Sequence, residues 1–218
     1  MTSDLWDRKW SVFEKRVRLF RYVPFVEFVL LAGSMATGRV HSGSDFDVIL
    51  GTKEKRVWTA WLISLFVFHI FGWRARPGRD KKNKINISHV VSPNGYVLTP
   101  PYNEYWRNLY TRLIPVAGDK TKISAFLHAN NWVGQRNKYD GDGVKLYSLN
   151  SFIKTVFEFF FGGHLGDWLE SFYIKMYSGR VGDPKKLGYK PRLVYNADRL
   201  EMYRDTKRIE EMIRRGDL

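Results

Sequence analysis

The sequence contains no cysteine in its 218 residues. Disulfide bonds, thiolate metal sites and cysteine nucleophiles are therefore excluded, and no disulfide-linked partner is expected. The first ten residues, MTSDLWDRKW, mix acidic and basic side chains and lack the apolar segment of a secretory signal. A reducing, cytoplasmic compartment fits both absences. The sequence also lacks internal repeats and low-complexity segments.

Acidic residues are scarce relative to basic ones. The chain has 22 Asp and Glu against 36 Lys and Arg, which gives a formal net charge of +14 and a pI near 9.9. Such an excess attracts polyanions such as nucleic acid, nucleotides or anionic lipid surfaces, although it also serves solubility. The composition is otherwise that of a folded protein, with 44% hydrophobic and 16% aromatic residues. The length suits one large domain or two small ones.

Long uncharged runs are also few, and residues 57–73 form the one that must be weighed as a membrane segment. Its 17 positions are fewer than the about 20 apolar residues that span a bilayer as a helix. Thr59, Ser64 and His69 interrupt it, and basic residues flank both ends, so it carries no orientation signal. We predict a buried helix that connects two strands, with membrane attachment as the weaker alternative.

The order of hydrophobic patterns predicts an α/β (α+β) fold. An α/β core is expected over residues 1–100 and a mainly helical half over residues 101–218. Within the core, the patterns predict a small mixed sheet from strands at 25–33, 46–52 and 85–91, with helices at 4–21 and 53–73. Beyond it they predict helices at 103–116, 121–133, 149–178 (broken at Gly162-Gly163) and 199–218.

A motif lies between the first two strands. Gly33-Ser34 ends the first strand, ten residues follow, and the second strand then opens with Asp45 and Asp47. Side chains at i and i+2 of a strand point to the same face, so these two carboxylates are expected side by side. Like charges that close raise each other's pKa unless something neutralises them. A divalent metal is the most economical neutraliser.

The motif resembles that of the nucleotidyltransferase superfamily typified by DNA polymerase beta, closely over residues 26–50 and more loosely through residue 91. The resemblance implies that the core over residues 1–100 is nucleotidyltransferase-like. The helical remainder resembles that of bacterial proteins carrying such a domain. The resemblance implies that Asp45 and Asp47 are catalytic and bind Mg²⁺ (or Mn²⁺). It also implies that Gly33 and Ser34 bind the triphosphate of an NTP. Hard oxygen ligands and a glycine that lets backbone approach phosphate are consistent with both roles.

The superfamily usually supplies a third carboxylate from a later strand, and here the sequence departs from the pattern. In the 85–91 strand, alternation puts Asn86 and Ser88 on the face where that carboxylate should lie. Neither residue is acidic, and an amide is not a base at neutral pH. Asp80 and Glu104, in neighbouring loops, are the alternative candidates for the role. We interpret His89, in phase with the isoleucines, as a core residue.

Two functions from different classes fit these residues. An enzyme would move a nucleoside monophosphate from an NTP to a hydroxyl, with RNA (such as a tRNA end) the favoured acceptor. A degenerate relative would bind nucleotide or RNA without catalysis. The retained paired carboxylates favour the enzyme. A basic loop supplies candidate phosphate or nucleic-acid contacts, although it is also compatible with a solvated connector. Its residues are Arg74, Arg76, Arg79, Lys81, Lys82 and Lys84.

Overall fold

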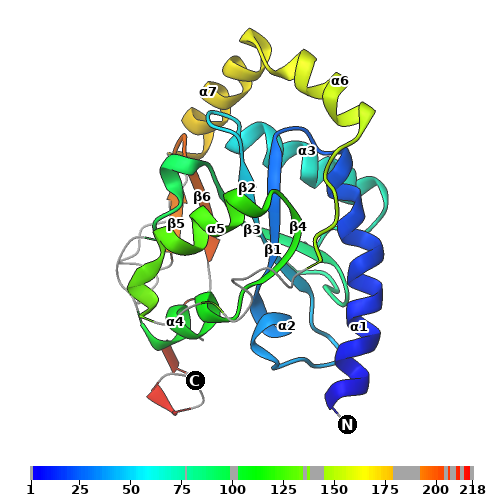
Figure 1. The fold of residues 1–218 in the computed structure, drawn as a ribbon, viewed down its shortest axis with the longest axis vertical. Helices are drawn as coiled ribbons and strands as arrows, with labels where there is room; N and C mark the ends of the chain where they lie inside the picture. Colours follow the sequence, from blue (N-terminus) through cyan, green and yellow to red (C-terminus); the bar gives the residue numbers. More distant parts are fainter. Residues whose placement is uncertain are drawn as a thin grey trace.

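The protein, described by a computed structural model, is a mixed α/β fold with helices on both faces of one six-stranded sheet (Figure 1). The structure describes residues 2–76, 78–98, 103–134, 137, 145–178, 192–203, 206, 210–211 and 214–216. The strands are β1 (Val26–Leu31), β2 (Phe46–Thr52), β3 (Ile85–Val91), β4 (Ile114–Gly118), β5 (Arg192–Tyr195) and β6 (Arg199–Tyr203). The α-helices are α1 (Thr2–Val17), α2 (Gly33–Thr37), α3 (Val57–Ile70), α4 (Glu104–Thr111), α5 (Lys120–Ala129), α6 (Phe152–Phe161) and α7 (His164–Ser178). Short 3₁₀ helices are η1 (Arg18–Tyr22), η2 (Pro93–Gly95) and η3 (Asn131–Val133).

The sheet has the strand order β4-β1-β2-β3-β6-β5. β1 and β2 are antiparallel, whereas β2 and β3 are parallel and are joined by the crossover helix α3. Two of the strands predicted from sequence, β2 and β3, have the predicted bounds, and β1 lies inside the predicted range. The mixed α/β class is therefore confirmed.

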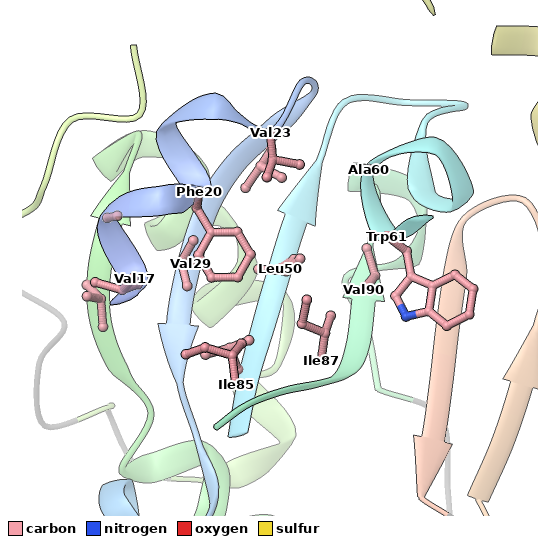
Figure 2. Close-up of a cluster of buried hydrophobic side chains, with 14 of the residues drawn as sticks. Val17, Phe20, Val23, Val29, Leu50, Ala60, Trp61, Ile85, Ile87 and Val90 are labelled. Carbon is pink, nitrogen blue, oxygen red and sulfur yellow. The ribbon is translucent and has the colours of Figure 1, made fainter. Parts of the chain in front are cut away.

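A hydrophobic core lies on each face of the sheet. On one face, η1 and α3 pack against β1, β2 and β3, where Phe20 and Ala60 meet Val29, Leu50 and Val90 (Figure 2). On the other face, α4 and α5 cover a second cluster around the side chains of the same strands that point the opposite way. Each large apolar side chain buried in this way contributes about 1.5–3 kcal/mol relative to an exposed one.

Helix α3 is the buried crossover that the uncharged run predicts. It is shorter than predicted, and its N-terminal turns are buried, with Trp58 fully enclosed. The C-terminal turn leaves Phe66 and Ile70 largely exposed. Within the described ranges, no helix combines the length and the apolar character needed to cross a membrane.

The helix predicted over 103–116 is wrong in its second part. Helix α4 ends at Thr111, and Ile114–Gly118 forms β4, which pairs with β1 at the edge of the sheet. Pro115 cannot continue a helix but is tolerated in an edge strand, and the β-branched residues beside it favour extended backbone. The predicted break at Gly162-Gly163 is confirmed, because α6 ends and α7 begins around it.

The charged helix predicted over 199–218 is also wrong at its start. Arg199–Tyr203 is β6, which pairs with β3 on one side and with β5 on the other. Pairing with a buried strand overrides a helical charge pattern here, because Glu201 and Leu200 are buried in the sheet. Most of 204–218 lies outside the described residues. Strands β4, β5 and β6 all come from beyond residue 101, so the sheet continues past the expected boundary at residue 100.

Candidate functional site

Asp45 and Asp47 lie where β2 begins, beside the turn that follows β1. The antiparallel pairing of β1 with β2 brings the Ala32 amide within 2.8 Å of the Asp47 carbonyl oxygen, to which it donates. Gly33 has a φ of +64° and packs directly on the Asp47 carboxylate, so any Cβ there would overlap Oδ2. Ser34 is the next residue, in the first turn of α2 and partly buried. The structure therefore brings Gly33, Ser34, Asp45 and Asp47 together.

The two carboxylates make an electrostatically unfavourable pair. Burial first and the charge of Asp45 second raise the pKa of Asp47 to about 7, against a hydrogen bond from Asn86 and the charge of Lys81. Burial also raises the pKa of Asp45, opposed by its own backbone amide and then by Lys81, His41 and Lys9. Two negative charges at this position thus lack full compensation from the protein. A bound divalent cation would supply it.

Asn86 is the residue at the third-carboxylate position. It pairs with Asp47 across β2 and β3, and its Nδ2 donates to Asp47 Oδ1 at 2.8 Å. The predicted direction of this side chain is therefore confirmed. Its amide oxygen is a ligand type that a hard metal accepts, but the group cannot take a proton from a hydroxyl.

A β-bulge changes the faces of the next residues on β3. Val48 pairs with Ile87, but Ile49 pairs with His89, so Ser88 is the extra residue. His89 consequently lies on the face of Asn86 and not on that of the isoleucines, contrary to the alternation argument. Its burial was predicted correctly, at 2% exposure. Strict alternation cannot place Ser88 with Asn86, because the bulge interrupts it between the two.

No other acid completes the site within the described residues. Asp80 is exposed, and its Oδ1 accepts a hydrogen bond from the Lys82 amide in its own loop. Glu104 is exposed in the first turn of α4. Across the part of the chain that the structure describes, no group of three or more His, Asp or Glu side chains could hold a metal.

Several residues around the pair gave no signal in the sequence. Lys9 of α1 is 3% exposed, and its Nζ donates to the Ser44 carbonyl at 2.8 Å and to Asn83 Oδ1 at 2.7 Å. It thereby joins the turn before Asp45 to the turn before β3. Tyr105 of α4 lies near the pair as well, since burial and then the charge of Asp47 raise its pKa to about 12. Both reach the site only through the tertiary fold.

Comparison of the chain with protein-family models, with curated proteins and with solved structures finds no match. No relative therefore supports the resemblance of the motif to the nucleotidyltransferases. Any function assigned to the chain has to be argued from its own geometry.

The donor set at this position fits a magnesium or manganese ion. Mg²⁺ prefers hard oxygen ligands and commonly binds through one or two carboxylates together with substrate phosphates. Asp45 and Asp47 supply the carboxylates, and the Asn86 amide oxygen is a further candidate. Two carboxylates without a third make a weak site by themselves, so nucleotide phosphates would have to complete the coordination.

The six cations of the basic loop form two groups in the structure, those that line a cavity and those that do not. Arg74, Arg76 and Lys81 line a cavity of ≈ 400 Å³, which also touches Asn86. Arg79 and Lys82 are exposed, and Lys84 is partly buried. The loop is thus more than a solvated connector, because three of its six cations line a cavity.

Proposed function

We propose that the protein is a metal-dependent nucleotidyltransferase that moves a nucleoside monophosphate from an NTP to a hydroxyl acceptor, with RNA such as a tRNA end favoured. The observation that carries this proposal is the Asp45–Asp47 pair, held against the backbone of Gly33 with charge that the protein compensates only in part. A protein that only binds nucleotide has no need for two carboxylates on one face.

Each residue of the motif has a part in the proposed reaction. Asp45 and Asp47 hold the ion, which when bound polarises phosphoryl oxygens and orients the attacking hydroxyl. The backbone of Gly33-Ser34 and the Ser34 hydroxyl contact the triphosphate. Lys81, whose charge reaches both aspartates, offsets part of the phosphate charge.

The bonds exchanged are those of an in-line displacement. The acceptor oxygen forms a bond to the α-phosphorus, and the bond from that phosphorus to the bridging oxygen breaks, which releases pyrophosphate. Asn86 cannot remove the hydroxyl proton, so the proton passes to water or to a phosphate oxygen of the substrate. Transfer is therefore expected to be slow for this class of reaction.

Positions 86 and 88 hold Asn and Ser instead of an acid, and this favours a second candidate function, that of a nucleotide- or RNA-binding module without catalysis. The two functions make different predictions for the same assay. Purified protein is incubated with each α-³²P-labelled NTP, total RNA and Mg²⁺ or Mn²⁺, and the products are separated on a gel. Label in RNA, in protein or in a small product supports transfer.

Asp47→Asn is the decisive variant, with Asp80→Asn as the control that removes a carboxylate from an exposed loop. We expect Asp47→Asn to abolish labelling and metal-dependent nucleotide binding, and Asp80→Asn to retain both. Nucleotide binding by wild type without any labelled product would favour the binding module. Equal labelling by wild type and Asp47→Asn would refute the proposed role of the pair.

A further inference from the structure

A polar cavity lies next to the candidate site, and apart from Lys81 and Asn86 its lining residues have no part in the proposed reaction. Strand β6 pairs with β3 at residues 89–91, and Arg74 forms a parallel bridge with Ile85, so the open side of β3 is limited to residues 86–88. The ≈ 400 Å³ cavity fills this side, between β3, α3, α7 and the basic loop. Its volume is within the range of about 300–1,000 Å³ that is typical of small-molecule sites.

The polar residues that line this cavity mostly donate hydrogen bonds. Arg74, Arg76 and Lys81 contribute three cations, and no Asp or Glu is among the lining residues. The like charges are close enough that Arg76, after burial itself, lowers the pKa of Arg74. Cations gathered in a partly enclosed space without a carboxylate are the arrangement expected of an anion site.

Two residues that line this cavity each carry a buried N–H donor with no acceptor within the described residues. One is Nε1 of Trp61, a side chain that is 5% exposed, and the other is Nε of Arg74. Figure 2 shows Trp61 reaching from α3 past Val90, on the side of the cluster where β6 lies. Buried N–H groups are almost always paired, so each unpaired one calls for a partner. Two of them on residues that line one cavity favour a ligand with several acceptor oxygens.

We propose that this cavity binds a phosphate group of a small-molecule substrate. The proposal rests on the proposed function in one respect: Asn86 lines the cavity and also donates to Asp47, so a ligand held here would extend toward the transfer site. The phosphate belongs either to the NTP or to a phosphorylated acceptor. Binding of the group needs no metal, because the protein itself supplies the positive charge.

The test uses the full chain labelled with ¹⁵N, in EDTA, titrated with pyrophosphate. Each of the eight tryptophans gives one indole N–H signal, and the signal missing from Trp61→Phe identifies that of Trp61. We expect this signal to shift on titration. Arg74→Gln should weaken binding at least about tenfold, as loss of a charge-assisted hydrogen bond does. Arg79→Gln, which removes an equal charge from the exposed part of the loop, should leave binding unchanged.

A Trp61 signal that does not move, or equal weakening by Arg74→Gln and Arg79→Gln, would overturn the proposal. Arg76→Gln serves as the second variant if Arg74→Gln does not fold. Asp47→Asn separates this proposal from the proposed function, because it should bind pyrophosphate in EDTA and still fail in transfer. If ATP competes with pyrophosphate, the phosphate that the cavity binds belongs to the NTP. If ATP with Mg²⁺ and pyrophosphate bind at the same time, the phosphate that the cavity binds belongs to a phosphorylated acceptor.

A second inference comes from an independent observation, the reversed polarity of α6. Its polar side chains face the body of the protein. Glu158 accepts from the Phe25 amide at 2.7 Å and from Lys53 Nζ at 2.8 Å, and Lys154 Nζ donates to the Val26 carbonyl at 2.6 Å. A surface helix normally turns its apolar side inward. Here the apolar side faces outward.

The outward face of α6 and α7 is large enough for an interface. Phe152 and Phe159 are 83% and 84% exposed. With Phe160, Leu165, Trp168 and Phe172, they expose roughly 600–900 Å² of side chain at about 150–250 Å² per aromatic residue. The largest apolar patch on a typical monomer is about 300–600 Å². A stable interface buries about 800 Å² on each partner.

The charge of the same helices indicates which partner covers them. Residues 152–178 carry two lysines and three acids, in a chain with a net charge of +14. A helix that binds anionic lipid is normally rich in Lys and Arg, which this pair is not. The exposed side chains of this face are apolar, so two copies of this chain can meet through it without placing like charges in contact. We infer that a second copy covers this face, related by a two-fold axis.

Sedimentation velocity over a range of about 1–100 µM tests this inference, since a dimer interface of this size commonly holds at micromolar concentration. We expect a dimer for wild type and a monomer for Phe152→Ser/Phe159→Ser. The control Phe66→Ser changes a side chain that is 64% exposed on α3 and outside this face, and should remain dimeric. A monomeric wild type would overturn the inference, as would unchanged dimerisation of the double variant. Flotation of a monomeric wild type with phospholipid vesicles would assign the face to lipid instead.

Discussion

At the Asp47 carboxylate, three segments of the chain meet within hydrogen-bond or van der Waals distance. Oδ1 accepts from Asn86 of β3, and Oδ2 faces the backbone of Gly33. The contact with Gly33 leaves no room for a side chain at that position. Small substitutions at these positions are therefore expected to have large and specific effects.

Gly33→Ala should destabilise the fold strongly. The added Cβ overlaps Asp47 Oδ2, and the residue must also keep a left-handed backbone with φ of +64°. We expect a loss of roughly 2–5 kcal/mol in the free energy of unfolding, measured by denaturant titration. Gly38→Ala is the matched control, because Gly38 has φ of +79° with no neighbour within 4 Å of the position that an added methyl group would take. It should lose only about 1–2 kcal/mol from backbone strain. Equal losses would mean that the carboxylate contact is unimportant.

Asn86→Asp places a third carboxylate against Asp47 Oδ1, where the amide now donates at 2.8 Å. Repulsion should lower the melting temperature without metal, and Mg²⁺ with nucleotide should restore it. If a base is the missing element, transfer at neutral pH should also rise, since general base catalysis contributes about 10²–10⁴-fold. Melting curves with and without Mg²⁺ and ATP provide the first measurement. A variant identical to wild type in melting and activity would show that residue 86 does not contribute to the proposed metal site.

His89 is expected to make stability depend on pH. Burial lowers its pKa to about 4, with Arg199 and Arg192 adding to the effect and Glu201 opposing it. The ordinary histidine pKa is about 6.5, so the unfolded chain takes up this proton first as the pH falls. Stability should therefore be complete above about pH 6.5 and should decline toward pH 4, by roughly 3 kcal/mol from this group.

Denaturant titrations between pH 7.5 and 4.5 measure this decline. His89→Phe removes the titrating ring. In wild type neither ring nitrogen of His89 has a hydrogen-bond partner within the described residues, so the substitution breaks no hydrogen bond there. The variant should lose less stability than wild type over the same pH range. His128→Asn, at an exposed position, should follow wild type. Parallel curves for all three proteins would show that His89 does not titrate as expected.

The sequence is informative where local pattern decides the structure. Alternation and Gly33 place the strands around Asp45 and Asp47, and the same alternation places Asn86 correctly. It fails at His89, because a bulge shifts the register by one residue and leaves no local signature. Lys9 could not be predicted at all, since it reaches the turn before Asp45 from a helix that is distant in sequence.

At the scale of whole elements, the errors come from competition between local propensity and tertiary pairing. The 199–203 segment has a charge pattern that is compatible with a helix, but β3 offers a strand with an unpaired side. Glu201 in this strand is fully buried and pairs with Arg192 of β5. That compensation is visible only once both strands are in place. Helices α6 and α7 are predictable because the Gly162-Gly163 break is local.

Helix α3 begins with a cap that is supplied by another helix. The N-cap residue Arg56 gives no side-chain cap, and Glu170 of α7 instead accepts from the amides of Trp58 at 3.0 Å and Thr59 at 2.7 Å. Glu170→Ala leaves two buried donors unpaired and should cost roughly 2–4 kcal/mol. Glu170→Gln keeps one acceptor and should cost less. Denaturant titration compares both with Glu54→Ala, which changes an exposed acid and should be neutral. A neutral Glu170→Ala would show that α3 needs no such cap.

Over the whole molecule, the candidate site and the apolar face of α6 and α7 lie at opposite ends of the sheet. Figure 1 shows α2 at one end and the arch of α6 and α7 at the other. Gly33, which contacts the Asp47 carboxylate, is the first residue of α2. A dimer formed through the arch would therefore leave both copies of the site open to substrate. Association and the proposed transfer need not interfere with each other.

The net charge of +14 gives the last prediction, which concerns RNA. For a single strand, the logarithm of the binding constant falls with the logarithm of salt concentration by about 0.7 for each phosphate contacted. Arg79 and Lys82 are exposed cations of the basic loop that do not line the cavity, and Lys82 is adjacent to Lys81. If RNA follows this loop to the site, Arg79→Gln/Lys82→Gln should reduce the slope by about 1.4.

The control removes the same formal charge from elsewhere on the surface. Lys55 and Lys145 are exposed and lie outside the basic loop, so Lys55→Gln/Lys145→Gln should keep the wild-type slope. Fluorescence anisotropy with a labelled single-stranded RNA, at several salt concentrations, gives all three slopes. Equal reductions in the two double variants would mean that RNA responds to net charge alone, and the loop would lose its assigned role. A reduction confined to Arg79→Gln/Lys82→Gln would place the RNA path beside Lys81, whose charge reaches both aspartates.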